Sequence, residues 1–266
     1  MEQPLLTAGW RSVSASVPGT SHTKSNLPCQ DAHEVRTVAL ANESALVAVV
    51  ADGAGSASEG GSGARILCED LATRLGALAT IETVDTAEHA VRAAVAASRN
   101  VLQAEADERG VNLRDLACTV VVALIHPEWS VFAQIGDGAV VVPEAGTGEW
   151  NWIFWPERGE YANTTFFVTD TTALDHLQVD SMPFAVTDVA LFTDGLQGLV
   201  LNYETQDVLS SFFTRMTQPV RSLPGPGHSS SLSEGLSRYL ASAPVAARTD
   251  DDLSLVLAAR VDFPVP

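Results

Sequence analysis

Residues 117–142 read ACTVVVALIHPEWSVFAQIGDGAVVV, and this stretch decides the fold. It holds three apolar runs that are rich in β-branched residues, at 119–125, 131–135 and 139–142. Runs of this length, bounded by polar or glycine-containing segments, are typical of β-strands, and their short connections make them hairpin-like. We predict further strands of the same kind at 45–51, 165–168, 189–192 and 253–259.

Two pairs of helical segments lie between these strands. The spacing of apolar residues predicts helices at 59–78 and 86–108, and again at 203–216 and 231–241. Asp85, with Glu88 three residues later, is expected to cap the second helix, and Ser231 with Glu234 resembles a capping box for the last. The segment PVRSLPGPGHSS, at 219–230, is predicted to be a loop.

The order of these elements favours an α+β fold. Strands are followed by a helix pair, by hairpin-like strands, by a second helix pair and by a final strand, so a strict βαβ alternation is missing. This order favours antiparallel sheets with helices packed outside them over a doubly wound parallel sheet. Because no repeat, low-complexity tract or linker divides the chain, we predict a single domain over residues 1–266.

The composition limits the classes of partner. With 15 basic and 33 acidic residues the net charge is −18, which predicts no binding to nucleic acid or to an anionic membrane surface. The three cysteines form no Cys-x-x-Cys pair, and their odd number argues against a disulfide framework. Neither a signal peptide nor a run of about 18 apolar residues is visible, so we expect a cytoplasmic protein.

Aspartates stand at the ends of the predicted strands. Asp52, Asp137 and Asp194 each close an apolar run, and Asp251 precedes the last one. If these strands alternate in direction, the carboxylates converge on one rim of the sheet, where Asp31 can join them. Carboxylates at close quarters repel one another, so such a cluster needs cations. Oxygen ligands select hard ions such as Mg²⁺ or Mn²⁺.

Each aspartate also has a purely structural interpretation. Asp52-Gly53 and Asp194-Gly195 are compatible with turn or cap residues, and Gly136-Asp137-Gly138 is compatible with a tight hairpin. The run at 250–252 is compatible with a solvated loop. The combination of four such placements carries the metal hypothesis.

Several motifs resemble, in order, those of the protein phosphatase 2C family. They are VADGAGS at 50–56, the stretch at 117–142, LFTDGL at 191–196 and DDLSLVLA at 251–258. SHTKSNLPCQDAH at 21–33 and GEYANTTFFVT at 159–169 are similar to a bacterial branch of that family. The resemblance implies a β-sandwich of two antiparallel sheets flanked by helices, with a metal site at one end.

The resemblance also implies roles for individual residues. Asp52 would bridge two metal ions, Gly53 would be a ligand through its carbonyl oxygen, and Asp194 and Asp251 would complete the set. Asp31 matches the aspartate of a Glu-Asp pair in the family, although Gln30, which cannot supply a negative charge, stands before it.

A third metal ion and the phosphate contact are the remaining implied features. Asp137 resembles a ligand of a third, weaker metal site. The arginine that binds phosphate in many family members is replaced here by Asn26. His22, in the same loop, is our first candidate to take its place, and Lys24 or Arg11, on the preceding strand, are alternatives.

The implied activity is hydrolysis of phosphoserine or phosphothreonine in proteins, with a serine/threonine kinase or its targets as partners. Two Mg²⁺ or Mn²⁺ ions, with a possible third, would activate water, and the leaving hydroxyl would take its proton from a metal-bound water or His22. One alternative is a pseudophosphatase that acts as a binding module, which Gln30 and Asn26 favour. Another is a serine hydrolase with Ser62, Asp194 and His228, but Ser62 lies about ten residues beyond the end of its strand, not on the turn that this chemistry requires.

Overall fold

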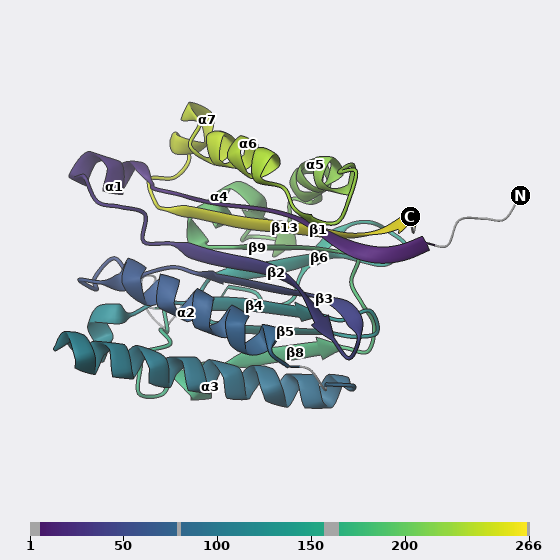
Figure 1. Ribbon diagram of the computed structural model, residues 1–266. Coiled ribbons are helices and arrows are strands. Elements are labelled where there is room, and N and C mark those ends of the chain that lie inside the picture. The colour runs from purple at the N-terminus through teal and green to yellow at the C-terminus, as the bar shows by residue number, and fades with distance from the viewer. Residues whose placement is uncertain (1–5, 79–80, 157–164, 265–266) are drawn as a thin grey trace, which may run out of the picture.

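The computed structural model of the protein describes residues 6–78, 81–156 and 165–264. Two large β-sheets stack face to face, and helices cover the outer face of each sheet (Figure 1). The predicted α+β fold, a β-sandwich flanked by helix pairs, is confirmed. No helix within the described ranges combines the length and the apolar character that crossing a membrane requires.

One sheet has five antiparallel strands in the order β2-β3-β4-β5-β8. Their bounds are β2 Ala32–Leu40, β3 Glu43–Ala51, β4 Val120–Ile125, β5 Ser130–Ile135 and β8 Gln178–Met182. Helices α2 (Gly60–Gly76) and α3 (Val84–Arg109) pack against its outer face. Strand β3 is therefore buried on both sides: Val47 and Val49 face the helices, whereas Leu46 and Val50 face the other sheet.

The other sheet has six strands in the order β12-β1-β13-β9-β6-β7, antiparallel except for the short β12–β1 pair. The strands are β1 Leu6–Val17, β6 Ala139–Pro143, β7 Trp150–Trp152, β9 Asp188–Phe192, β12 Gly227–His228 and β13 Leu253–Pro264. On its outer face lie the helices α5 Ser210–Arg221, α6 Ser230–Leu240 and α7 Ala243–Ala246.

Short elements complete the described structure. They are α1 Thr20–Ser25, α4 Gln197–Val200, the strand pair β10 Leu201–Asn202 and β11 Asp207–Val208, and 3₁₀ turns at Leu113–Leu116, Ala173–His176 and Asp194–Leu196. The core between the sheets contains Trp10, Phe132 and Leu191, each at most 1% exposed. Burying large apolar side chains of this kind contributes about 1.5–3 kcal/mol each.

Four local predictions are wrong. Residues 165–168 form no strand, because the chain turns there and the Phe167 amide is bound by the Asp170 carboxylate. The helix expected at 203–216 is shifted to α5, which continues through Pro219 into the predicted loop. The cap of α3 is Thr83 in place of Asp85, and the cap of α6 is Ser229, two residues before Ser231.

Candidate metal centre

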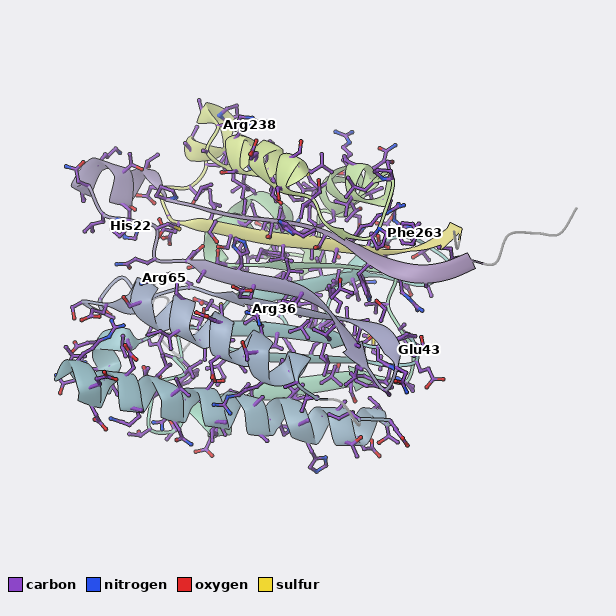
Figure 2. All side chains as sticks on the ribbon, in the orientation of Figure 1. His22, Arg36, Glu43, Arg65, Arg238 and Phe263 are labelled. Atoms are coloured by element: carbon purple, nitrogen blue, oxygen red, sulfur yellow. The ribbon has the colours of Figure 1, made fainter. Side chains whose placement is uncertain are left out.

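The sandwich brings the predicted aspartates to one end, the end at which Figure 2 labels His22 and Arg65. Asp31 precedes β2 and Asp52 follows β3, and the Ala32–Ala51 pair places them at the same end of the ladder. In the other sheet, Asp194 follows β9 and Asp251 precedes β13, which are also antiparallel neighbours. With Asp137, between β5 and β6, these residues form the carboxylate rim.

A hydroxyl group joins the two halves of the carboxylate rim. The Thr193 hydroxyl donates to Asp31 Oδ2 over 2.7 Å, and its oxygen accepts from the Ser254 amide over 2.9 Å. Asp31 is only 6% exposed, and its other oxygen, Oδ1, is buried without a hydrogen-bond partner. This oxygen is therefore available to a cation.

Burial and mutual repulsion raise the pKa of the rim carboxyls. Burial raises the pKa of Asp52 well above its usual value, and the charges of Asp31 and Asp194 add to this effect. Burial raises the pKa of Asp31 to about 7, against the stabilising hydrogen bond from Thr193. It raises the pKa of Asp194 to about 8, with further contributions from Asp137 and Asp251. Each of the five carboxyls thus interacts electrostatically with at least one other.

Asp52 and Gly53 are held by backbone contacts with the other segments. The Thr119 amide donates to the Asp52 carbonyl over 2.8 Å, and the Gly53 amide donates to the Gln30 carbonyl over 3.2 Å. A Cβ on residue 53 would lie 2.3 Å from the carbonyl carbon of Gly60, so only glycine fits against the start of α2. The chain at residue 53 is therefore fixed beside the rim.

The donor set fits a hard divalent cation. It consists of carboxylate oxygens, and the buried Oε1 of Gln30 lacks a hydrogen-bond partner, as Asp31 Oδ1 does. Such oxygens are the ligands that Mg²⁺ and Mn²⁺ prefer. Within the described ranges, however, no three histidine, cysteine, aspartate or glutamate side chains are already arranged around a single ion position. The fit rests on the orphaned oxygens and on the repulsion between the carboxylates.

Asp252, which the sequence pattern places in a solvated charge run, is buried and binds groups from separate segments of the chain. It is 2% exposed, and its carboxylate accepts from the Gly19 amide over 2.7 Å and from the Gln30 amide over 2.6 Å. The Nδ1 atom of His22 lies 2.9 Å from each of its oxygens. The charge of His22 also acts on Asp251. The structure thus places His22 beside the rim and fixes its ring.

Of the alternatives to His22, Arg11 is not brought to the rim. Arg11 donates to the Arg221 carbonyl and lies over the ring of Phe263, 4.4 Å from its centre. Val17, which pairs with Leu253, marks the rim end of β1. Arg11 lies six residues from Val17, which is about 20 Å at 3.3 Å per residue. Asn26, at the position of the family's arginine, ends α1 with a left-handed backbone, φ 55°. Lys24 lies on the exposed surface of α1.

Arg65, on α2, is a cation that sequence reasoning missed. Together with Asp31 and Ser16 it lines a cavity of about 340 Å³. Its guanidinium donates to Ser62 Oγ over 3.1 Å, and the side chain is exposed. Spacing alone gives no signal, because α2 reaches the rim only through the packing of the sheet.

Two structural interpretations from the sequence are not supported. Gly136-Asp137-Gly138 closes no hairpin, because β5 and β6 belong to different sheets and the segment carries the chain between them. The serine hydrolase arrangement does not form, because both ring nitrogens of His228 contact other serines, Ser12 and Ser233. Asp194 instead lies among the rim carboxylates.

This β-sandwich is the fold of solved bacterial serine/threonine phosphatases. Stp1 from Staphylococcus aureus shares the fold with a TM-score of 0.62 and 18% identity, over 97% of both chains. The catalytic domain of the phosphatase PstP, in complex with two manganese ions, matches with a TM-score of 0.63 and 17% identity, over 96% of this chain and 100% of that one.

The sequence comparisons define the family. The pattern of protein phosphatase 2C matches residues 18–240. Serine/threonine-protein phosphatase 3 of Escherichia coli (strain K12) is 37% identical over 257 residues, which cover 94% of this chain and 98% of the relative. The chain belongs to the protein phosphatase 2C family, and the resemblance noted in the sequence is confirmed.

Proposed function

We propose that this protein hydrolyses phosphoserine and phosphothreonine in proteins with the help of divalent cations. The observation that carries the proposal is the buried carboxylate rim with its orphaned Asp31 oxygen. The Escherichia coli relative, which is named a serine/threonine-protein phosphatase, supports the same activity. The anionic substrate and the net charge of −18 are compatible only if cations neutralise the rim locally.

We assign the cation ligands to the rim. Asp52 and the carbonyl of Gly53 would hold the ions together with Asp31, Asp194 and Asp251. Asp137 would serve a third ion, and its charge already acts on Asp194. When bound, two Mg²⁺ or Mn²⁺ ions lower the pKa of coordinated water and neutralise charge on the phosphoryl oxygens.

His22 is assigned to the phosphate and the leaving group. The Asp252 carboxylate binds the Nδ1 atom of His22. The other ring nitrogen, Nε2, would therefore be the atom that contacts the substrate. A protonated ring would donate to a phosphoryl oxygen or give its proton to the departing serine or threonine oxygen. Asp252 would keep the ring in position and stabilise its positive charge.

The proposal also includes the substrate class, the partners and the setting. Phosphorylated proteins are the substrates, and a serine/threonine kinase or its targets are the partners. A cytoplasmic setting fits the free cysteines Cys29, Cys68 and Cys118.

The test compares hydrolysis of a phosphothreonine peptide by the wild type and by Asp52→Asn, with millimolar Mn²⁺ and with EDTA. We expect turnover only by the wild type with Mn²⁺, and release of phosphate is measured. His22→Ala is expected to lower kcat by about 10²-fold, the typical contribution of a general acid. No turnover by the wild type above the background level of Asp52→Asn would overturn the proposal and favour a binding module.

A further inference from the structure

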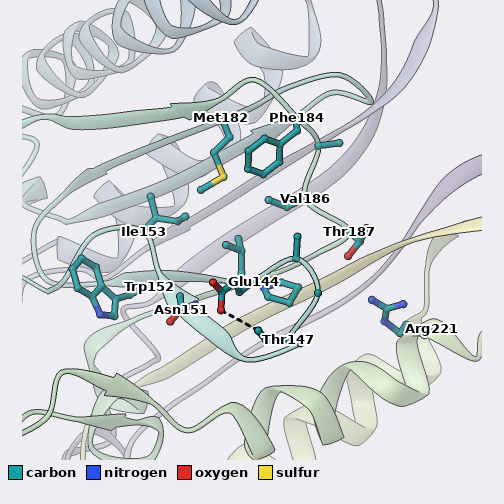
Figure 3. Close-up of a pocket in the computed structure, with 16 residues that line it drawn as sticks. Glu144, Thr147, Asn151, Trp152, Ile153, Met182, Phe184, Val186, Thr187 and Arg221 are labelled. Atoms are coloured by element: carbon teal, nitrogen blue, oxygen red, sulfur yellow. Dashed lines mark hydrogen bonds between the residues drawn. The ribbon is translucent and has the colours of Figure 1, made fainter.

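The end of the sandwich opposite the carboxylate rim contains a cavity of about 940 Å³. This far-end cavity lies between the edges of the two sheets, where β6 and β7 of one sheet face the segment that follows β8 of the other (Figure 3). Its volume is at the upper end of the usual range for binding pockets. Nothing in the proposed chemistry uses it.

The walls of the far-end cavity are apolar and partly open to solvent. Val186 belongs to the core between the sheets, and Ile153 and Met182 are partly buried and pack against that core, so the cavity is an opening into it. Phe184 is 53% exposed and Trp152 is 38% exposed, and both line the cavity. Exposed aromatic side chains around an opening into an apolar core are a feature of binding surfaces.

The charges at the far-end cavity favour a basic partner. Arg221 is bound to the buried carboxylate of Asp188, with 2.7 Å between Nε and Oδ1, so its positive charge is neutralised. Glu144 accepts from the Thr147 hydroxyl over 3.0 Å (Figure 3), and no ion pair with Glu144 is found within the described ranges. One uncompensated negative charge therefore stands beside the apolar walls.

We propose that the far-end cavity is a docking site for the phosphoprotein substrate, and this rests on the proposed function. The segment that docks carries an aromatic or large aliphatic residue next to a lysine or arginine. The apolar residue enters between Phe184 and Ile153, and the basic residue pairs with Glu144. Docking outside the catalytic end raises the effective concentration of the phosphorylated residue at the rim.

The fold sets the distance between the two sites. Strand β6, Ala139–Pro143, runs from the rim towards the cavity, and Asp137 and Glu144, seven residues apart in the chain, flank its two ends. At about 3.3 Å per residue this is about 23 Å. An extended substrate segment follows the same rise, so the motif must lie at least about seven residues from the phosphorylated residue.

The experiment uses three phosphothreonine peptides: one with a Phe-Lys motif ten residues from the phosphothreonine, one with the motif at three residues, and one with Ser-Ser in its place. We expect KM about tenfold lower for the first peptide only, with kcat unchanged. Phe184→Ser and Glu144→Gln remove this advantage. Leu174→Ser is the matched control, because Leu174 is 47% exposed and lies outside the cavity.

Turnover of p-nitrophenyl phosphate separates the two proposals. All four proteins are expected to hydrolyse it equally, because it is too small to reach both sites. Equal KM for the three peptides, with normal p-nitrophenyl phosphate turnover, overturns the docking site and leaves the phosphatase intact. Loss of the advantage in Leu174→Ser also overturns the docking site. A wild-type dimer that Phe184→Ser dissociates would show that a second copy covers the cavity, and would overturn the proposal as well.

Discussion

Replacing Asp31 by asparagine tests the physical basis of the metal centre without substrate. In the protein without metal, burial raises the pKa of Asp31 from 3.8 to about 7. The folded protein therefore binds this proton more tightly than the unfolded chain does. The contribution of Asp31 to stability is therefore largest below about pH 4 and is lost as the pH rises towards 7, because the unfolded chain releases the proton first.

The size of the effect follows from the same values. At about 1.4 kcal/mol per pKa unit, a rise from 3.8 to about 7 corresponds to about 4 kcal/mol at pH 8. The asparagine side chain keeps an oxygen for the Thr193 hydroxyl and carries no charge. In EDTA we expect Asp31→Asn to be more stable than the wild type by up to about 4 kcal/mol at pH 8, and equally stable near pH 4.

The assay is urea denaturation at pH 4 and pH 8, with EDTA and with Mn²⁺. Asp262→Asn, at an exposed position at the other end of β13, is the control and is expected to change little. With Mn²⁺ the order reverses, because the wild type gains binding energy that the variant loses. An Asp31→Asn protein that is less stable than the wild type in EDTA at pH 8 would refute the cost of burying the charged Asp31 carboxylate.

Three further predictions use the same protein. Mn²⁺ at about 100 times its Kd stabilises the wild type by about 2.7 kcal/mol, and an unchanged melting temperature would contradict the ligand assignment. Asp252→Ala leaves the Gly19 and Gln30 amides without their acceptor. We expect the free energy of unfolding, measured in urea, to fall by about 1–3 kcal/mol, and kcat to fall as well. A normal kcat and pH profile would show that His22 is positioned by other contacts. Gly53→Ala places a Cβ 2.3 Å from the Gly60 backbone, so we expect a lower melting temperature and loss of Mn²⁺ binding. Gly55→Ala is the control and is expected to change neither, because a Cβ at residue 55 meets nothing within 4 Å.

The sequence predicts best the elements whose side chains face a core on both sides. Strand β3 reads as an unbroken apolar run because helices cover one face and a sheet the other. Strand β8, QVDSM, is an edge strand with partly exposed side chains, so it has no such pattern and the sequence does not predict it. Residues 166–168 are apolar, but the carboxylate of Asp170 binds the Phe167 amide and turns the chain.

The site is predictable to the extent that it follows strand ends. Asp52 and Asp194 stand out in the sequence because each closes an apolar run. Asp252 and Arg65 do not stand out in the sequence, because their roles arise from tertiary packing. Asp252 accepts hydrogen bonds from amides more than 200 residues away in the chain. Arg65 lies on a helix that reaches the rim only in the folded sandwich.

The pairing of β1 with β13 has a consequence for biosynthesis. Leu6 pairs with Pro264 and Val17 with Leu253, so β1 finds its neighbour only among the last residues of the described chain. At about 5–20 residues per second, a ribosome needs about 12–50 s to make the intervening chain. During that time the long edge of β1 is without its main partner and is exposed to aggregation or chaperone capture. Nascent chains arrested before β13 should therefore be protease-sensitive in β1, even where the helix pair α2 and α3 has already folded onto its own sheet.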